Sequence, residues 1–200
     1  MTSRRQTVLD AAVRVLGREG PRGLTHRATD REAGLPAGST ANLFGRRAQL
    51  LAGIVERMLE LDRELWERSW AGGEPADVQA LAGTLARFVR AAVEPWTAEV
   101  VRARYHLQLV VPDTTLAGHR LLTAELRERM AAVGADPGNA EMILSALDGL
   151  LLRAVTYGGD LLPAEDRIAA WLASSMRPVS RPRRRSPPTP RTPGSPTPVP

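Results

Sequence analysis

Apolar residues recur at intervals of three and four from residue 3 to about residue 176, the spacing that places them on one face of an α-helix. No stretch shows the alternation of a β-strand, and no segment is repeated. The pattern predicts an all-α protein of about nine helices. We expect them at about 3–19, 25–32, 36–44, 47–69, 77–93, 97–111, 114–133, 137–157 and 163–176.

Glycine and proline divide this pattern into elements. The run from Gly20 to Gly23 ends the first helix, and Ala33-Gly34 turns the chain after the second. Pro36 suits the first position of a third helix, whose core anchors are Leu35 and Phe44. Two consecutive helices joined by a tight turn over residues 25–44 have the sequence form of a helix-turn-helix.

The long fourth helix ends before a Gly- and Pro-containing segment at 71–75, so it links two parts of the chain. We expect a helix-turn-helix domain over 1–47 and a helical domain over 48–176, joined by the helix at 47–69. Residues 177–200 are rich in Pro, Ser and Arg and lack an apolar face, which predicts a disordered tail.

Charge is distributed unevenly along the chain. Residues 1–50 carry a net +5, residues 51–176 a net −6, and residues 177–200 a net +6, and every one of the 27 basic residues is arginine. Arginine binds phosphate and guanine through a planar fork of N–H donors. The basic N-terminal part therefore indicates a polyanion partner, whereas the acidic middle argues against wrapping DNA around the whole surface.

Residues 5–51 resemble the DNA-binding domain of TetR-family transcriptional regulators. The matching features are Leu9, Ala11, Ala12, Gly20, Thr25, the sequence Ala33-Gly34-Leu35-Pro36-x-Gly38-Ser39, Phe44, and Arg47-x-x-Leu50. The resemblance covers about a quarter of the chain and implies an all-helical homodimer that binds DNA. It also implies a C-terminal domain that binds a small molecule and dimerises.

The resemblance and the charge pattern give a set of candidate DNA-binding residues. A helix N-terminus offers free N–H groups to phosphate, and Asn42 can bond adenine in two places. Arg47 matches a position where the family usually has a phosphate-binding Lys. The full set is Arg4, Arg5, Thr25, His26, Ala37, Gly38, Ser39, Thr40, Asn42, Leu43, Arg46 and Arg47, and Arg181 and Arg183–Arg185 of the tail can add nonspecific attraction.

Three features, at four positions, depart from the family pattern. Leu43 stands where a Tyr is usual, so a phosphate-binding hydroxyl is missing. Thr29-Asp30 replaces an apolar residue and Ala, which puts a hydroxyl where the core is expected. Gly45 replaces a Pro or polar residue in the turn.

Candidate ligand-binding residues lie in the predicted helical domain: Trp66, Tyr105, His106, Gln108 and His119. The residues at 105–108 are equally compatible with ordinary helix positions. His106 and His119 are thirteen residues apart on different helices, which is not a metal-site spacing.

The helix at 137–157 has an apolar band that is wide for one buried face, and this predicts a second partner surface. We expect a four-helix dimer interface built from Ile143, Leu144, Leu147, Leu151, Ala154, Val155, Ile168, Trp171 and Leu172. Asp148 within the band is either a buried polar contact at this interface or an exposed edge residue. Trp96 and Trp171 are expected to be core residues.

These features predict a cytoplasmic, homodimeric transcriptional regulator, a repressor by family resemblance, that a small-molecule effector releases from a near-palindromic operator. The alternative is an α-helical small-molecule-binding protein whose N-terminal helix-turn-helix domain no longer recognises DNA. An enzyme is not expected, because the chain has no nucleophile–base constellation, metal cluster or phosphate loop. We expect no cofactor, and no run of about 18 apolar residues predicts a membrane span.

Overall fold

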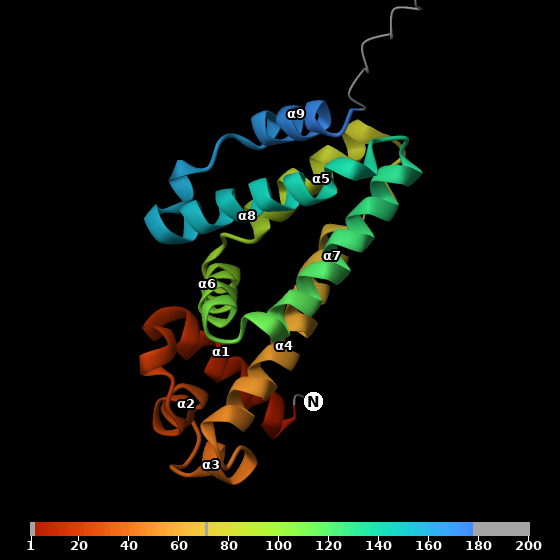
Figure 1. The fold of residues 1–200 in the computed structure, drawn as a ribbon. Coiled ribbons are helices and arrows are strands. Elements are labelled where there is room, and N and C mark those ends of the chain that lie inside the picture. The colour runs from red at the N-terminus through yellow and green to blue at the C-terminus, as the bar shows by residue number, and fades with distance from the viewer. Residues whose placement is uncertain (1–2, 71, 178–200) are drawn as a thin grey trace, which may run out of the picture.

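A computed structural model describes residues 3–70 and 72–177, and within these residues all regular structure is helical (Figure 1). The nine α-helices of this part are α1 (Arg4–Gly23), α2 (His26–Ala33), α3 (Ser39–Leu43), α4 (Arg47–Ser69), α5 (Val78–Ala91), α6 (Pro95–Val110), α7 (Pro112–Ala132), α8 (Ala140–Tyr157) and α9 (Glu165–Ser175). The 3-10 turns Pro137–Asn139 and Gly159–Leu161 flank α8. The all-α prediction is confirmed, while the predicted disorder of the tail concerns 178–200, which lie outside the described residues.

Helices α1, α2 and α3 gather at one end of the molecule, which we call the head (Figure 1). Helix α4 starts in the head and runs alongside α7 toward the opposite end, where α5, α8 and α9 lie. Helix α6 packs against both α1 and α8, so it also connects the two ends.

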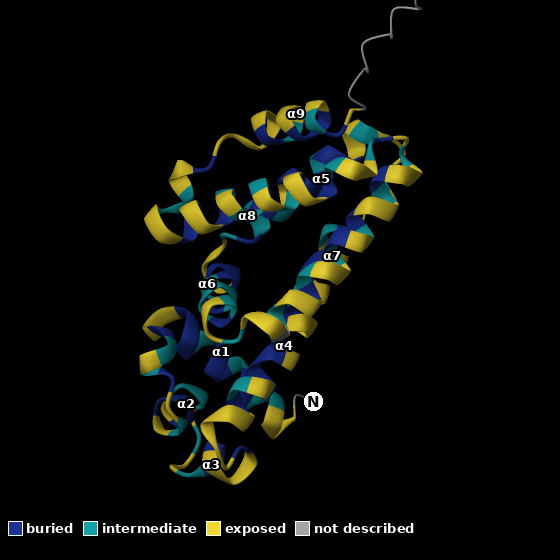
Figure 2. Ribbon diagram, viewed as in Figure 1, coloured by how far each residue is buried: buried dark blue, intermediate teal, exposed yellow. Residues whose placement is uncertain are grey.

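Two buried clusters hold these ends together, and α4 and α6 contribute to both (Figure 2). The head cluster joins α1, α2 and Phe44 to the first half of α4, and it includes Val100, Ala103 and Leu107 of α6. The second cluster joins the end of α4 to α5, α8 and α9. The apolar core of the head therefore extends beyond residue 47, and the division into domains at that residue stays a prediction.

Helices α1 and α6 approach each other closely at Gly17. A Cβ atom added to Gly17 would lie 2.2 Å from the backbone oxygen of Glu99, which is closer than any real contact. Only glycine fits there, because two helix backbones meet without a side chain between them. This contact attaches the first helix of the head directly to α6.

Local signals placed most helix ends correctly, with two instructive exceptions. Helix α4 has the predicted bounds, and Thr25 caps α2 by accepting a hydrogen bond from the Ala28 N–H at 3.1 Å. The first helix continues past Gly20, which breaks its axis with a φ of 69° before Pro21 starts another turn. Helix α3 begins at Ser39 rather than at Pro36. No helix among the described residues is long and apolar enough to cross a membrane.

Candidate DNA-binding head and ligand cavity

Helix α3 exposes a short row of side chains at the tip of the head. Ala37, Asn42, Leu43 and Arg46 are all exposed, as their predicted roles in DNA contact require. Ala41 of α3 is exposed as well, and it is a further candidate contact that the sequence analysis did not include. Leu43 is 42% exposed, so the position usually occupied by Tyr presents an apolar side chain to solvent.

Ser39 and Thr40, both predicted to bind DNA, are buried, so their DNA contact stays a prediction that their exposed side-chain surface does not support. The Thr40 hydroxyl donates to Asp30 Oδ1 at 2.6 Å, and the Ser39 hydroxyl donates to the Pro36 carbonyl at 2.6 Å. Both side chains therefore complete the helix N-terminus. Gly38 precedes them with a φ of 90°, a left-handed conformation that glycine adopts without strain.

Asp30 of α2 is the residue that fixes the start of α3. Its Oδ2 accepts from the Gly38 N–H at 2.8 Å, and its Oδ1 accepts from the Thr40 N–H at 2.7 Å and from the Thr40 hydroxyl. Burial opposes its charge, but the hydrogen bonds from Thr40 and Gly38 outweigh this and lower the pKa of Asp30. The departure from the family pattern at Thr29-Asp30 thus supplies a cap for the predicted recognition helix. The Thr29 hydroxyl is satisfied as well, because it donates to the Thr25 carbonyl at 3.0 Å.

The arginines that were predicted to bind DNA have different partners in the structure. Arg4 donates to the Ser39 hydroxyl at 2.9 Å, which places it beside α3. Arg5 instead pairs with Glu56 of α4 at 3.1 Å. Arg47 donates to the carbonyls of Pro21 and Leu24, so its guanidinium braces the segment between α1 and α2. Its phosphate contact stays a prediction, as do those of Thr25 and His26 at the start of α2.

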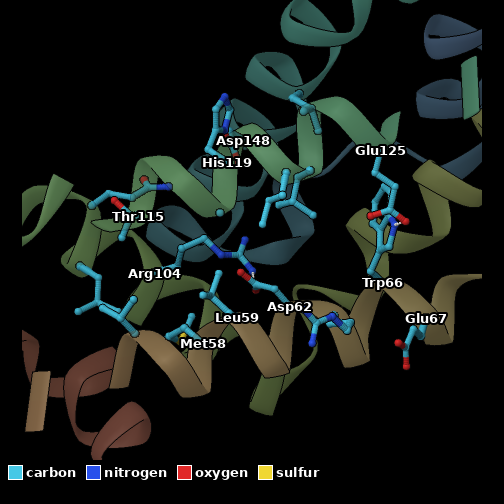
Figure 3. A pocket seen from close by; sticks show the side chains of 18 of the residues that line it. Met58, Leu59, Asp62, Trp66, Glu67, Arg104, Thr115, His119, Glu125 and Asp148 are labelled. Carbon is cyan, nitrogen blue, oxygen red and sulfur yellow. Dashed lines mark hydrogen bonds and ion pairs between the residues drawn. The ribbon is translucent and has the colours of Figure 1, made fainter. Parts of the chain in front are cut away.

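A cavity of about 530 Å³ opens between α4, α6, α7 and α8 (Figure 3). Of the residues predicted to bind a ligand, Trp66, Gln108 and His119 line it. Tyr105 and His106 do not: the Tyr105 hydroxyl donates to the Asp148 carbonyl at 2.8 Å, and the His106 ring faces Gly20 of α1. Both residues lie on other faces of α6, which periodicity alone could not distinguish, and their ligand-binding role stays a prediction.

Charged side chains of the cavity are mostly paired with one another. Arg104 pairs with Asp62, and the two point toward each other in Figure 3. Glu125 accepts from the Trp66 indole N–H at 2.7 Å and from Arg129 at 3.0 Å. Sequence reasoning missed Asp62, Arg104 and Glu125, since the pairing of polar residues on three helices has no local signature.

Most side chains of the predicted dimer interface are buried within a single chain, and their place in an interface stays a prediction. Ile143, Leu147, Leu151, Ala154, Val155, Ile168 and Leu172 are at most 7% exposed and pack in the chain's own core, and Leu144 lines the cavity. A side chain that is buried in its own protomer presents no surface to a partner. Of the predicted interface, only Trp171 is exposed, at 45%.

The wide band on α8 consists of two faces, and the second of these is exposed. It carries Met142 and Leu152, which are 69% and 48% exposed, on the side of α8 opposite Ile143 and Leu147. Trp171 lies on the exposed side of α9, and Trp96 is 36% exposed, so the prediction that both tryptophans are core residues is wrong. Asp148 is half-buried and lines the cavity, so it is not an exposed edge residue.

An all-helical chain with a helix-turn-helix head and a cavity in its helical body has the architecture of a DNA-binding transcriptional regulator. Solved structures support this class. A TetR-family member, SCO1917 from Streptomyces coelicolor A3, is 28% identical with a TM-score of 0.68, covering 88% of this chain and 99% of that chain. The multidrug binding protein EbrR complexed with malachite green is 25% identical with a TM-score of 0.67, covering 88% of this chain and 99% of that one.

The complex of EbrR with ethidium is 27% identical to this chain with a TM-score of 0.63, covering 88% of this chain and 100% of that chain. No protein-family model matches the chain, and no curated protein sequence is significantly similar to it. The chain shares the fold of these proteins over nearly their full length, and together with the motif in the head this supports its resemblance to TetR-family regulators. Its structural neighbours are regulators rather than enzymes.

Proposed function

We propose that the protein is a homodimeric repressor that a small molecule releases from its operator. The proposed coupling between ligand binding and DNA binding rests on one observation. Val55 and Met58 of α4 and Leu107 of α6 belong to the buried cluster of the head and also line the cavity. A ligand that moves these side chains therefore changes the packing of the head directly, without an intervening element.

Helix α4 is the element that transmits such a change. Arg57, which is 6% exposed, fixes α4 to α1 by donating to Asp10 at 2.7 Å. On the other side of the head, Arg14 and Arg18 of α1 pair with Glu32 of α2, and Arg18 also reaches Glu99 of α6 at 3.5 Å. A shift of α4 or α6 is thereby passed to the helix-turn-helix as a rigid unit. Ligand binding and DNA binding then weaken each other by the same factor, as linkage requires.

Dimerisation is proposed to use the exposed face of α8 together with α9. Met142, Ser145, Gly149 and Leu152 follow one another at helical spacing on that face, and Trp171 adds an exposed aromatic on α9. Small and apolar residues at such spacing allow two helices to pack closely. A two-fold axis through this face would hold two heads at a fixed separation for successive major grooves of a near-palindromic site.

Selection of bound duplexes from a random pool tests the DNA-reading role. The full chain is expected to enrich a short near-palindrome, with an affinity that falls steeply with salt. Asn42→Ala is expected to change the preferred bases, because Asn42 is exposed on α3 and can bond a base edge. Glu19→Ala, which removes an exposed carboxylate of α1, is the matched control and leaves the selected sequence unchanged.

The second candidate function is a small-molecule-binding protein whose head does not select a sequence. The exposed Leu43 favours it, because this position lacks the hydroxyl that holds phosphate in the family. Uniform binding of all duplexes, combined with saturable binding of a dye, would establish this second function and refute the first.

A further inference from the structure

We infer that the cavity binds a flat aromatic cation, with the Asp148 carboxylate as its counter-charge. This inference rests on the proposed ligand-responsive function and names the chemical class of the ligand. The cavity volume of about 530 Å³ suits a molecule of three or four fused or linked rings. Its walls include Trp66, Trp70, Leu59 and Leu122, which offer aromatic and apolar surface to such a molecule.

The charge inventory of the cavity leaves one carboxylate uncompensated. Asp62 is paired with Arg104, and Glu125 with Arg129. Arg63 and Glu67 are exposed side chains of α4 and carry opposite charges. The Asp148 carboxylate, by contrast, accepts no hydrogen bond and forms no ion pair with any residue in the described part of the chain, although the backbone carbonyl of Asp148 accepts from Tyr105.

Asp148 is well placed to meet a ligand. It is half-buried on α8 and lines both the large cavity and a smaller pocket that continues from it toward Phe88 and Leu151. In Figure 3 it lies beside His119, across the cavity from Met58 and Leu59 of α4. A carboxylate removed from bulk water without a partner is unfavourable, and a bound cation removes that cost.

The pKa of the Asp148 carboxyl is raised, as expected for a carboxylate without a paired cation. Burial raises it, and the nearby carboxylates Asp62 and Glu141 act in the same direction. Arg104 and His119 oppose this rise, but Arg104 is committed to Asp62, and the His119 ring is hydrogen-bonded to Glu141 at 3.0 Å. An approaching cation therefore meets a carboxylate that no side chain has neutralised.

An anionic ligand is the competing possibility, and the arginines of the cavity argue against it. Arg104 is held by Asp62, and Arg129 is held by Glu125 and by Glu74 at 2.5 Å. The Nε atoms of both arginines are buried and lack a hydrogen-bond partner among the described residues. The lining as a whole carries four carboxylates, Asp62, Glu67, Glu125 and Asp148, against three arginines, and this net negative charge disfavours a bound anion.

Dye binding to the full chain without DNA tests the inference. Three probes of comparable size are titrated: ethidium as the aromatic cation, Nile red as a neutral dye, and 1-anilinonaphthalene-8-sulfonate as an anion. We expect saturable ethidium binding, and a loss of at least about tenfold in ethidium affinity in Asp148→Asn, which keeps the side-chain shape and removes the charge. Nile red binding should be unchanged in this variant, which also shows that the cavity remains folded.

Two further variants complete the experiment. Asp148→Glu keeps the charge and should retain ethidium affinity within a few-fold, whereas Glu128→Gln removes an exposed carboxylate from α7 outside the cavity and should change nothing. The inference is overturned if the wild type fails to bind ethidium or prefers the anion, or if Asp148→Asn binds ethidium as well as the wild type. Duplex selection without dye separates these failures from failure of the DNA-reading role.

Discussion

Substitution of Asp30 by Ala should both destabilise the protein and reduce the sequence specificity of its DNA binding. Asp30 is 3% exposed and accepts three hydrogen bonds at the start of α3, and Thr40, which supplies two of them, is fully buried. Because water cannot readily replace the lost acceptor, the Gly38 and Thr40 donors are left unsatisfied. Loss of a helix cap and of charge-assisted hydrogen bonds together predicts a decrease of about 2–4 kcal/mol in the free energy of unfolding.

Urea denaturation measures this free energy, with Glu19→Ala as a control that removes an exposed carboxylate from the same head. The control should change the free energy of unfolding by less than about 0.5 kcal/mol. Duplex selection by the same variant should yield a degenerate sequence, because α3 no longer has a fixed start. Unchanged stability in Asp30→Ala would refute the capping role, and an unchanged selected sequence would refute its effect on recognition.

The lowered pKa of Asp30 adds a dependence on pH to this prediction. A carboxyl whose folded-state pKa lies below its unfolded value of about 3.9 stabilises the fold above that value and loses this effect as the pH falls through the folded-state pKa. The stability difference between the wild type and Asp30→Asn should therefore be constant near neutral pH and shrink below about pH 4. A difference that grows on acidification would contradict the assignment.

Two other substitutions test the coupling and the dimer. Gly17→Ala should cost about 1–3 kcal/mol of stability and disturb the contact of α1 with α6, because its Cβ would meet the Glu99 carbonyl. Thermal unfolding measures this cost. Gly83→Ala inside α5, whose Cβ meets only a flexible arginine side chain at 3.5 Å, should instead stabilise the protein by up to about 1 kcal/mol. Equal behaviour of the two alanine variants would contradict the close approach. Leu152→Arg, on the exposed face of α8, should make the protein monomeric, as measured by light scattering. Leu109→Arg, at an 85% exposed site on α6, should leave the dimer intact. If both variants are dimers, the interface lies elsewhere.

Local chemistry explains which parts of the fold were predictable. Thr25 and Asp77 cap their helices through side chains that accept from N–H groups three residues later, and short-range signals of this kind are readable in sequence. The start of α3 was misplaced because Pro36 has the form of a first helical residue. The actual start depends on Gly38 and on an acceptor eight residues earlier in the chain, Asp30.

The candidate sites were less predictable, since they depend on contacts between distant segments. The apolar band of α8 has a buried half and an exposed half, and hydrophobicity does not show which half the chain covers with its own core. Tyr105 and His106 are neighbours of the cavity-lining Gln108 on α6, and only the packing of α6 against α1 and α8 separates them from it. Asp148 was singled out as unusual, and its place in the cavity became visible only when α4, α6, α7 and α8 were assembled.

The central claim is that the head and the cavity are coupled through the side chains that they share. The most direct measurement is the affinity of the full chain for its selected duplex, with and without a dye that binds the cavity, together with the dye affinity with and without that duplex. We predict that both affinities fall, and by the same factor. A dye that saturates the cavity while the duplex affinity stays constant would contradict the account.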